Sequence, residues 1–307
     1  ARSMSDCTQG LVRIIPPSQV TESTLLTSTV PENEHPAYNA GATYANGARV
    51  IAARKIYENN SGGNLTGIYP PNNLTQWADL GFDNRWKMFD LYSSTITEQA
   101  SSIIVELVTT ESSNALVLLG LQASYVDVIA THPTGGVIFN KRYTMQVSTG
   151  VKGLYSWLWR ERTAKTSLIE LAIPPYRGMT VRVEIHAPSG IAKCGTLILG
   201  RQSILGQLQW GYKWSLTDFS KKEVSEDGTI TIKKRDYASR PEFSMRVERR
   251  DFDRIARIAA KYRAEPAIWV VGTLHEMMTV RGFYRDFALV AEHSAWLDCS
   301  LQIEGLI

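Results

Sequence analysis

The residue types that support catalysis are present in this chain, but their spacing matches no catalytic motif. His275 and Glu276 begin like the His-Glu-x-x-His pattern of zinc proteases, yet Thr279 stands where the second histidine would be, and zinc held at that spacing needs both ligands. Residues 200–206 lack the Gly-Lys-Ser/Thr of a phosphate-binding loop, and no Gly-x-Ser-x-Gly elbow occurs. We therefore expect no catalytic residue, no metal, no cofactor and no enzymatic activity.

Aromatic side chains with a regular spacing are the more informative group. Tyr155, Trp157 and Trp159 alternate along one predicted strand, so their rings lie on the same side of it. Trp210, Tyr212 and Trp214 repeat the pattern. Such rows either stack on a sugar, contact another subunit or pack in a core, and the sequence leaves these three roles open.

Composition restricts the class of protein. The 307 residues are 44% hydrophobic and 21% charged, with a net charge of +3, which indicates a folded chain of two or three domains. The longest apolar runs, such as residues 115–121, are too short to cross a bilayer, and the first residues lack the apolar core of a secretory signal. We expect synthesis in a cytoplasm and no membrane insertion.

The three cysteines, Cys7, Cys194 and Cys299, show no Cys-x-x-Cys spacing. An odd count without that spacing argues against a zinc site or a disulfide framework, so we interpret them as small buried side chains. Positive charge is concentrated in residues 233–263, which contain eleven Lys or Arg and five Asp or Glu. We favour a solvated surface with ion pairs here over a nucleic-acid groove, because the acidic residues are interleaved throughout.

The elements that position these residues divide at a stretch of four aromatics. Trp77, Phe82, Trp86 and Phe89 stand within thirteen residues, and each buries a large apolar area. We interpret residues 77–90 as a rigid joint between two units; the alternative is a continuous core. The predicted organisation is an N-terminal arm (1–35), a small module (36–86), a β-sandwich or jelly roll (87–205) and a C-terminal β unit (206–307). The alternative for the arm, which contains a short β-like run at residues 11–15, is a strand laid on the surface of the same chain.

A mainly β fold follows from short runs separated by turn residues. In the small module we expect strands at 48–52 and 55–58 around a tight turn at Ala53 and Arg54. Eight strands are expected in the sandwich, with a turn at Pro188-Ser189-Gly190, and a final hairpin closes the chain. The one predicted helix spans residues 251–263, where apolar residues recur at helical spacing. The predicted sandwich strands are 102–109, 115–121, 125–131, 136–147, 154–159, 167–173, 180–186 and 192–199.

The small module resembles a known family. Its pattern Tyr44-x2-Gly47-x2-Val50-x6-Tyr57, followed by Pro70 and Trp77, is similar to the chitin- and cellulose-binding modules of families 5 and 12. The resemblance implies that exposed aromatics stack on sugar rings. On that basis Tyr38, Tyr57 and Trp77 are the candidate sugar contacts, with module core as the alternative.

The chain as a whole resembles a group of structural proteins of tailed bacteriophages. The likeness rests on Ile14-Ile15-Pro16, Val30-Pro31-Glu32, Asn84-Arg85-Trp86-Lys87 and Asp218-Phe219-Ser220, taken in this order. It implies a virion protein of the tail tip, baseplate or fibre-attachment region that forms a homo-oligomeric ring or trimer with other tail proteins. The alternatives are a receptor-binding protein that contacts a host surface glycan and, third, a glycan depolymerase, because carboxylate pairs are recognised only by their separation in space.

Overall fold

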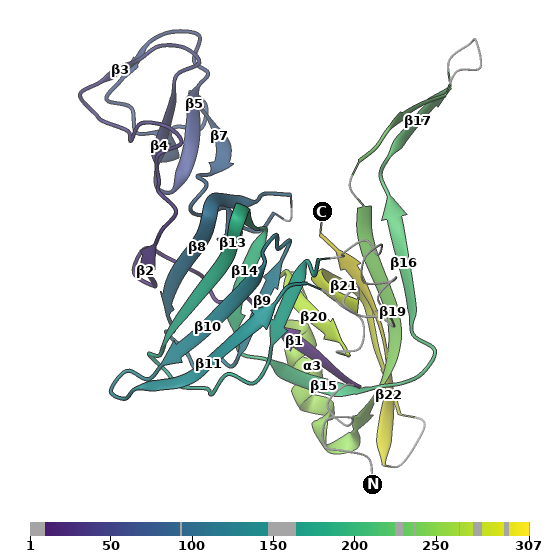
Figure 1. Ribbon diagram of the computed structural model, residues 1–307. Coiled ribbons are helices and arrows are strands. Elements are labelled where there is room, and N and C mark those ends of the chain that lie inside the picture. Colours follow the sequence, from purple (N-terminus) through teal and green to yellow (C-terminus); the bar gives the residue numbers. More distant parts are fainter. Residues whose placement is uncertain are drawn as a thin grey trace, which may run out of the picture.

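The fold is mainly antiparallel β, as the turn spacing predicted. The computed structural model describes residues 10–92, 94–146, 164–224, 230–235, 237–263, 265–272, 278–291 and 295–306. Among these, no helix has the length and apolar composition needed to cross a bilayer. Figure 1 shows a small sheet unit at one corner, a central pair of sheets and a larger closed sheet from which a narrow hairpin projects.

The C-terminal unit is a seven-stranded sheet that closes on itself, because its edge strand β15 also pairs with β19. Its apolar interior is formed by alternate residues of most strands together with helix α3. At Gly282, a Cβ atom would lie 2.0 Å from the carbonyl oxygen of Glu304, so only glycine allows β21 and β22 to approach here. The strand order is β15 (Ser203–Leu208), β1 (Leu11–Ile15), β20 (Ala267–Val271), β21 (Thr279–Val290), β22 (Trp296–Gly305), β19 (Tyr237–Glu248) and β16 (Lys213–Asp218).

Strand β1 corrects the expectation of an N-terminal arm. It lies inside the sheet, paired with β15 on one side and β20 on the other. Val12, Ile14 and Ile15 are fully buried. The local sequence, a short apolar run before two prolines, did not reveal this, because the partners of β1 lie some 190 to 260 positions away along the chain, as the pairs Arg13–Ile204 and Arg13–Val270 show.

The central sandwich packs a five-stranded sheet against a three-stranded one. Its core contains Leu116 and Leu118 of β9 against alternate residues of the larger sheet, such as Val126, Val183 and Val105. Strands β8, β10 and β13 of the larger sheet show the apolar alternation of a half-buried sheet. The strand order of the five-stranded sheet is β11 (Val137–Thr144), β10 (Tyr125–Thr131), β13 (Thr180–Cys194), β8 (Thr97–Val108) and β2 (Leu25–Ser28). The strand order of the three-stranded sheet is β12 (Ser167–Glu170), β9 (Ala115–Leu119) and β14 (Thr196–Gly200).

The turn predicted at Pro188-Ser189-Gly190 is wrong. Strand β13 continues through it, and its pairing with β8 shifts between Ala187 and Ile191. Because both halves of β13 pair with the same partner strand, the three residues form a bulge that keeps the strand direction.

Strands β9 and β14 are apolar on both faces, because they lie between the other two layers. Ala115, Val117 and Ile198 point away from the sandwich core and pack against Ile15 and Ile268 of the C-terminal unit. This shared cluster joins the two units by buried apolar contact. The run 115–121 was expected as a strand for its apolar content, and its double burial explains the lack of alternation.

The small module is inserted within the sandwich, between β2 and β8 (Figure 1). The hairpin predicted around Ala53 and Arg54 is present, and both residues have positive φ, 47° and 71°. The module core is formed around Trp77, which is fully buried. One of its sheets pairs β3 (Thr43–Tyr44) with β6 (Leu65–Thr66). The other has the order β4 (Arg49–Ala52), β5 (Lys55–Asn59) and β7 (Trp77–Phe82), and a 3-10 turn η1 spans Pro70–Asn72.

The four aromatics of the predicted joint are divided between two cores. Trp77 belongs to the small module, whereas Trp86 and Phe89 contribute to the sandwich core, with Phe82 packed against its edge. The 3-10 turn η2 (Lys87–Phe89) follows, and the backbone N–H of Met88 donates to Thr97 Oγ1 at 2.9 Å. The stretch therefore connects the module to the sandwich by fixed contacts on the sandwich side.

The predicted helix is present as α3 (Phe252–Lys261), preceded by the 3-10 turn η3 (Arg249–Asp251). Ile255 and Ala259 are buried against the C-terminal sheet. Phe252, expected on the same apolar face, is 43% exposed. It is the first residue of the helix, where the chain enters from the surface turn η3, so the predicted stripe begins one turn later.

Candidate functional site

The sugar-contact candidates of the small module are divided by burial. Tyr57 and Trp77 are buried in its core, and Trp77 Nε1 donates to the carbonyl oxygen of Ile68 at 3.1 Å. A ring that is buried in a core cannot stack on a sugar. Tyr57 and Trp77 are therefore core residues of the module. Tyr38 is half-buried and contacts the exposed ring of Tyr69 edge-on, with centroids 5.6 Å apart.

Tyr155, Trp157 and Trp159 lie outside the described residues, as do His275, Glu276 and Cys7. The other two cysteines, Cys194 and Cys299, are buried and unpaired by disulfide, in agreement with their interpretation as small apolar side chains. Burial raises the pKa of each thiol to about 12. A thiol held in its protonated form is a poor nucleophile.

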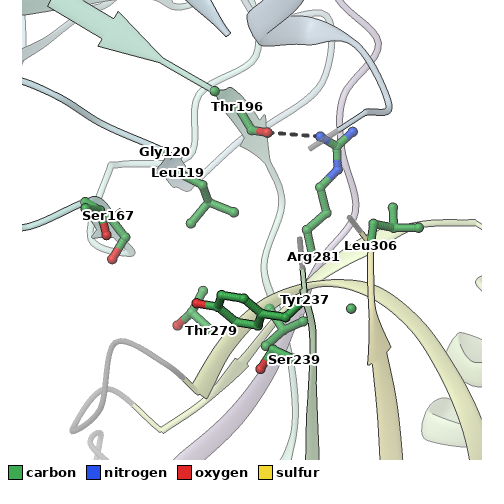
Figure 2. Close-up of a pocket in the computed structure, with 13 residues that line it drawn as sticks. Leu119, Gly120, Ser167, Thr196, Tyr237, Ser239, Thr279, Arg281 and Leu306 are labelled. Carbon is green, nitrogen blue, oxygen red and sulfur yellow. Dashed lines mark hydrogen bonds between the residues drawn. The ribbon is translucent and has the colours of Figure 1, made fainter. Parts of the chain in front are cut away.

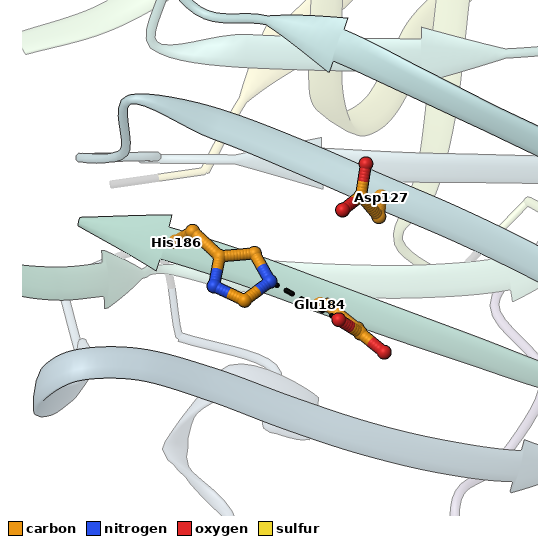
Figure 3. A group of neighbouring side chains, drawn as sticks. All are labelled: Asp127, Glu184 and His186. Carbon is orange, nitrogen blue, oxygen red and sulfur yellow. Dashed lines mark hydrogen bonds and ion pairs between the residues drawn. The ribbon is translucent and has the colours of Figure 1, made fainter. Parts of the chain in front are cut away.

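One group of described side chains has the donor types of a metal site. Asp127 of β10 lies opposite Glu184 of β13, and His186 follows two residues later on the same face (Figure 3). Their ligand atoms lie within 4.8 Å of one another. His186 Nε2 lies 3.1 Å from Glu184 Oε2.

These carboxylates are already neutralised by cations of the same sheet. Arg142 donates two hydrogen bonds to Asp127, from Nε at 2.7 Å and from Nη2 at 2.8 Å, and this contact holds the pKa of Asp127 below its usual range. Arg182 donates to Glu184 at 2.7 Å. Because like charges directly opposite on paired strands are unfavourable, the arginines explain how the sheet tolerates two facing acids. The group is an ion-pair network, and a cation would have to displace both arginines.

A cavity of about 330 Å³ lies between the sandwich and the C-terminal unit (Figure 2). Hydroxyl groups from both units face it, including those of Thr196, Tyr237 and Thr279. Arg281 stands at its edge with its guanidinium directed toward Thr196 (Figure 2). Nη1 donates to Thr196 Oγ1 at 3.1 Å, and Nη2 donates to the carbonyl oxygen of Asp90 at 2.6 Å.

Arg281 is a structural link and not an open anion site. It is 5% exposed, and none of the described carboxylates lies within ion-pair distance of it. Burial lowers the pKa of its guanidinium, while the nearby Asp90 raises it. Its two hydrogen bonds join β21 to β14 and to the end of the joint, so the guanidinium is committed to holding two units together.

Exposed apolar side chains gather on the projecting hairpin, which we call the ribbon (residues 210–240). Strand β16 pairs with the first part of β19, and β17 (Lys221–Val224) pairs with β18 (Ile230–Lys233) beyond the body of the protein (Figure 1). Trp210, in the turn before β16, is 92% exposed. The other large apolar residues of the ribbon that are more than a third exposed are Trp214, Leu216, Phe219, Ile232 and Tyr237.

On the β16–β19 part of the ribbon these side chains share one face. Trp214 lies opposite Pro241, Leu216 opposite Ser239, and Asp218 opposite Tyr237, so all six residues point to the same side of the two strands. Further along β19, Phe243 on this face enters the buried core. The face therefore continues outward from the core. Tyr237 and Ser239 line the cavity of Figure 2, whereas Trp214 and Leu216 are 38% and 50% exposed.

The sequence identified this region only in part. The period-two row at Trp210, Tyr212 and Trp214 pointed to it, although β16 begins at Lys213 and the first two aromatics precede the strand. Leu216 and Ile232 gave no signal, since a single apolar residue in a charged stretch is common on protein surfaces. Arg281 gave none either, because its partners Asp90 and Thr196 are remote in the chain.

No protein-family model, curated protein or solved structure matches this chain. The fold and the contacts described above define it as a mainly antiparallel β protein of three units, in which the ribbon carries six large apolar or aromatic side chains that are more than a third exposed.

Proposed function

We propose that the protein is a virion structural protein of a tailed phage, an adaptor of the tail-tip, baseplate or fibre-attachment region that assembles with copies of itself into a ring or trimer. The observation that carries the proposal is the ribbon, on which large apolar side chains such as Trp210, Leu216 and Ile232 are more than a third exposed. Exposed apolar patches of this kind mark protein contacts, and aromatic residues are enriched at such interfaces. The resemblance of the chain to phage structural proteins supports the same function.

A second copy of the chain is the partner that the geometry favours. The ribbon projects on one flank of the molecule, while the small module lies on the other (Figure 1). A contact between two different surfaces generates a closed ring when the rotation between copies closes. Strand β16 also has a free edge, since β19 is its one partner among the described strands, and a free edge accepts a further strand.

The test is the oligomeric state of the full chain and of two ribbon variants. We expect the purified protein to form a defined oligomer by analytical ultracentrifugation, and Leu216→Glu and Phe219→Glu to shift it to monomer. Leu74→Glu, at an exposed leucine of the small module (62%, against 50% for Leu216), is the matched control and should leave the oligomer intact. Circular dichroism verifies that each variant is folded. A wild-type chain that stays monomeric at all concentrations, and is missing from purified phage particles, would refute the proposal.

A second candidate function is binding of a host surface glycan through the small module. The observation that favours it is the exposed ring of Tyr69, which packs edge-on against Tyr38, because an exposed aromatic ring offers an apolar surface on which a sugar can stack. A glycan array with the wild type, Tyr69→Ala and the control Leu74→Ala tests it. Binding lost in Tyr69→Ala alone supports the function, and an array without any bound glycan rejects it.

A further inference from the structure

Two segments connect the small module to the sandwich, and we call them together the neck: residues 29–36 lead from β2 into the module, and residues 83–90 lead from β7 back toward β8. Two ion pairs join one segment to the other. Glu32 lies 3.6 Å from Arg85 Nη1, and Glu34 lies 2.9 Å from Lys87 Nζ. Glu34 Oε2 also accepts the backbone N–H of Asn84 at 3.0 Å. The two segments are therefore held side by side by carboxylates of the first.

The module adds a contact of its own through the turn between β4 and β5. The guanidinium of Arg54 lies over the ring of Trp86 at 5.2 Å and donates to the carbonyl oxygen of Val20 at 3.3 Å. Ala53 and Arg54 both have positive φ, a backbone conformation that is unfavourable for residues with a Cβ atom. The contacts of Arg54 with Trp86 and Val20 of the sandwich offset part of the conformational cost of this turn.

We propose that these contacts set the orientation of the small module, and that the module swings about the neck when the Glu32–Arg85 and Glu34–Lys87 pairs are broken. The four side chains are 24–35% exposed, so their attraction is reduced by water and salt. The sandwich end of the neck is fixed independently, because Asn84 bonds the backbone of Glu98 through both atoms of its amide. Movement is thereby confined to the module side.

A further charged group beside these pairs is Asp83, and Asp90 also interacts with Lys87. The carboxylate of Asp83 is fully buried, and its Oδ1 has no hydrogen-bond partner among the described residues. Glu34 and Glu32 both face it, so Arg85 and Lys87 oppose three carboxylates at one place. Breaking the pairs removes the attraction that holds the first segment against this acidic group.

The orientation is measured by pulsed electron paramagnetic resonance between two spin labels in the full chain. Leu74→Cys in the module and Val137→Cys in the sandwich supply two well-exposed positions, in a Cys7→Ser background because Cys194 and Cys299 are buried. We expect one narrow distance distribution in the parent and a distribution at least twofold broader in Glu32→Gln/Glu34→Gln. Arg54→Ala should broaden it as well.

The matched control is Glu58→Gln, which removes an exposed ion pair with Arg49 inside the module and should leave the distribution narrow. Raising NaCl from about 0.05 M to 1 M in the unmutated background tests the same pairs by screening alone, so the proposal stays testable if a variant fails to fold. An equally narrow distribution in the neck variant and at high salt would overturn it. So would a broad distribution in the parent at low salt.

Discussion

The guanidinium of Arg281 donates a hydrogen bond of 2.6 Å to the carbonyl oxygen of Asp90, which lies 191 positions earlier in the chain. With its second bond to Thr196, one side chain of the C-terminal unit contacts both the end of the joint and the inner sheet of the sandwich. The contact lies beside the apolar cluster of Ile15, Val117 and Ile268 that joins the same two units. Polar and apolar contacts thus fix one relative placement of the sandwich and the C-terminal unit.

Removing this link should weaken the contact between the sandwich and the C-terminal unit and lower the free energy of unfolding. Arg281→Ala leaves the Asp90 carbonyl without its donor and opens the cavity further, and we expect a loss of about 2–3 kcal/mol in the free energy of unfolding. Arg281→Met should cost less, because it fills the space without burying a charge. Urea unfolding measures both. Arg177→Ala removes an exposed arginine bonded to the carbonyl oxygen of Thr110 and should cost about 1 kcal/mol or less.

Substitution in β1 distinguishes a core strand from an arm. Ile14 is fully buried between two neighbouring strands, so Ile14→Ala should lower the free energy of unfolding by about 2–5 kcal/mol through lost contact and the cavity left behind. Ile204→Ala, at a half-exposed position of the adjacent β15, should change it by about 0.5 kcal/mol. Equal effects of the two substitutions would contradict the described sheet.

The strained turn of the small module offers a stabilising substitution. Ala53 has φ of 47°, and glycine adopts this conformation without the Cβ clash, so Ala53→Gly should stabilise the β4–β5 hairpin by about 0.5–1 kcal/mol. Ala52→Gly, one residue earlier in the strand, should destabilise it by about the same amount. Hydrogen exchange of the β5 amides in the full chain measures both. The prediction fails if exchange is faster in Ala53→Gly than in the wild type.

Asp83 predicts a pH dependence of stability. Burial raises the pKa of its carboxyl, with the nearby Glu34 and Glu32 adding to the shift. The folded state therefore binds a proton more readily than the unfolded state, and this group favours folding more as the pH falls through the raised value. Asp83→Asn should raise the melting temperature at pH 7, and the difference from the wild type should shrink toward pH 4.

The control for Asp83 is Asp79→Asn, which removes a carboxylate paired with Lys55 at 2.6 Å at the surface of the module. Because this pair is about a third exposed, its loss should give no stabilisation at any pH. A melting temperature that is lower in Asp83→Asn than in the wild type at pH 7 would show that the buried carboxylate is favourable as it stands.

The sequence predicted the local elements well, because their signals are local. Residues 125–131 and 267–271 are strands at those positions, since apolar runs of this length between turn residues fit buried strands. The helix was found from its spacing to within two residues at its end. The hairpin at Ala53 and Arg54 was found despite lacking the usual glycine, because a short run with apolar β-formers stands on each side of the turn.

What the sequence did not reveal is the pairing of remote segments. Nothing near Leu11 indicates that its neighbours are β15 and β20, and nothing near β2 indicates that it completes the sandwich sheet beside β8. The candidate contacts Tyr57 and Trp77 could not be separated from core residues, because an aromatic in a glycine-rich module has the same pattern in either role. Their burial became clear only from the packing around Leu65 and Val50.

The sandwich is inserted in the C-terminal unit between β1 and β15, and the small module is inserted in the sandwich between β2 and β8. The units therefore become complete in a fixed order while the chain is synthesised. The small module is complete once β7 has left the ribosome, and the sandwich once β14 has, but β1 must wait for β20. At ordinary rates of translation this delay is roughly ten seconds or more, during which Val12, Ile14 and Ile15 have no partner strands. A nascent chain that exposes such an apolar segment is expected to bind a chaperone, and we expect premature termination before β20 to leave an aggregating product that retains a folded module.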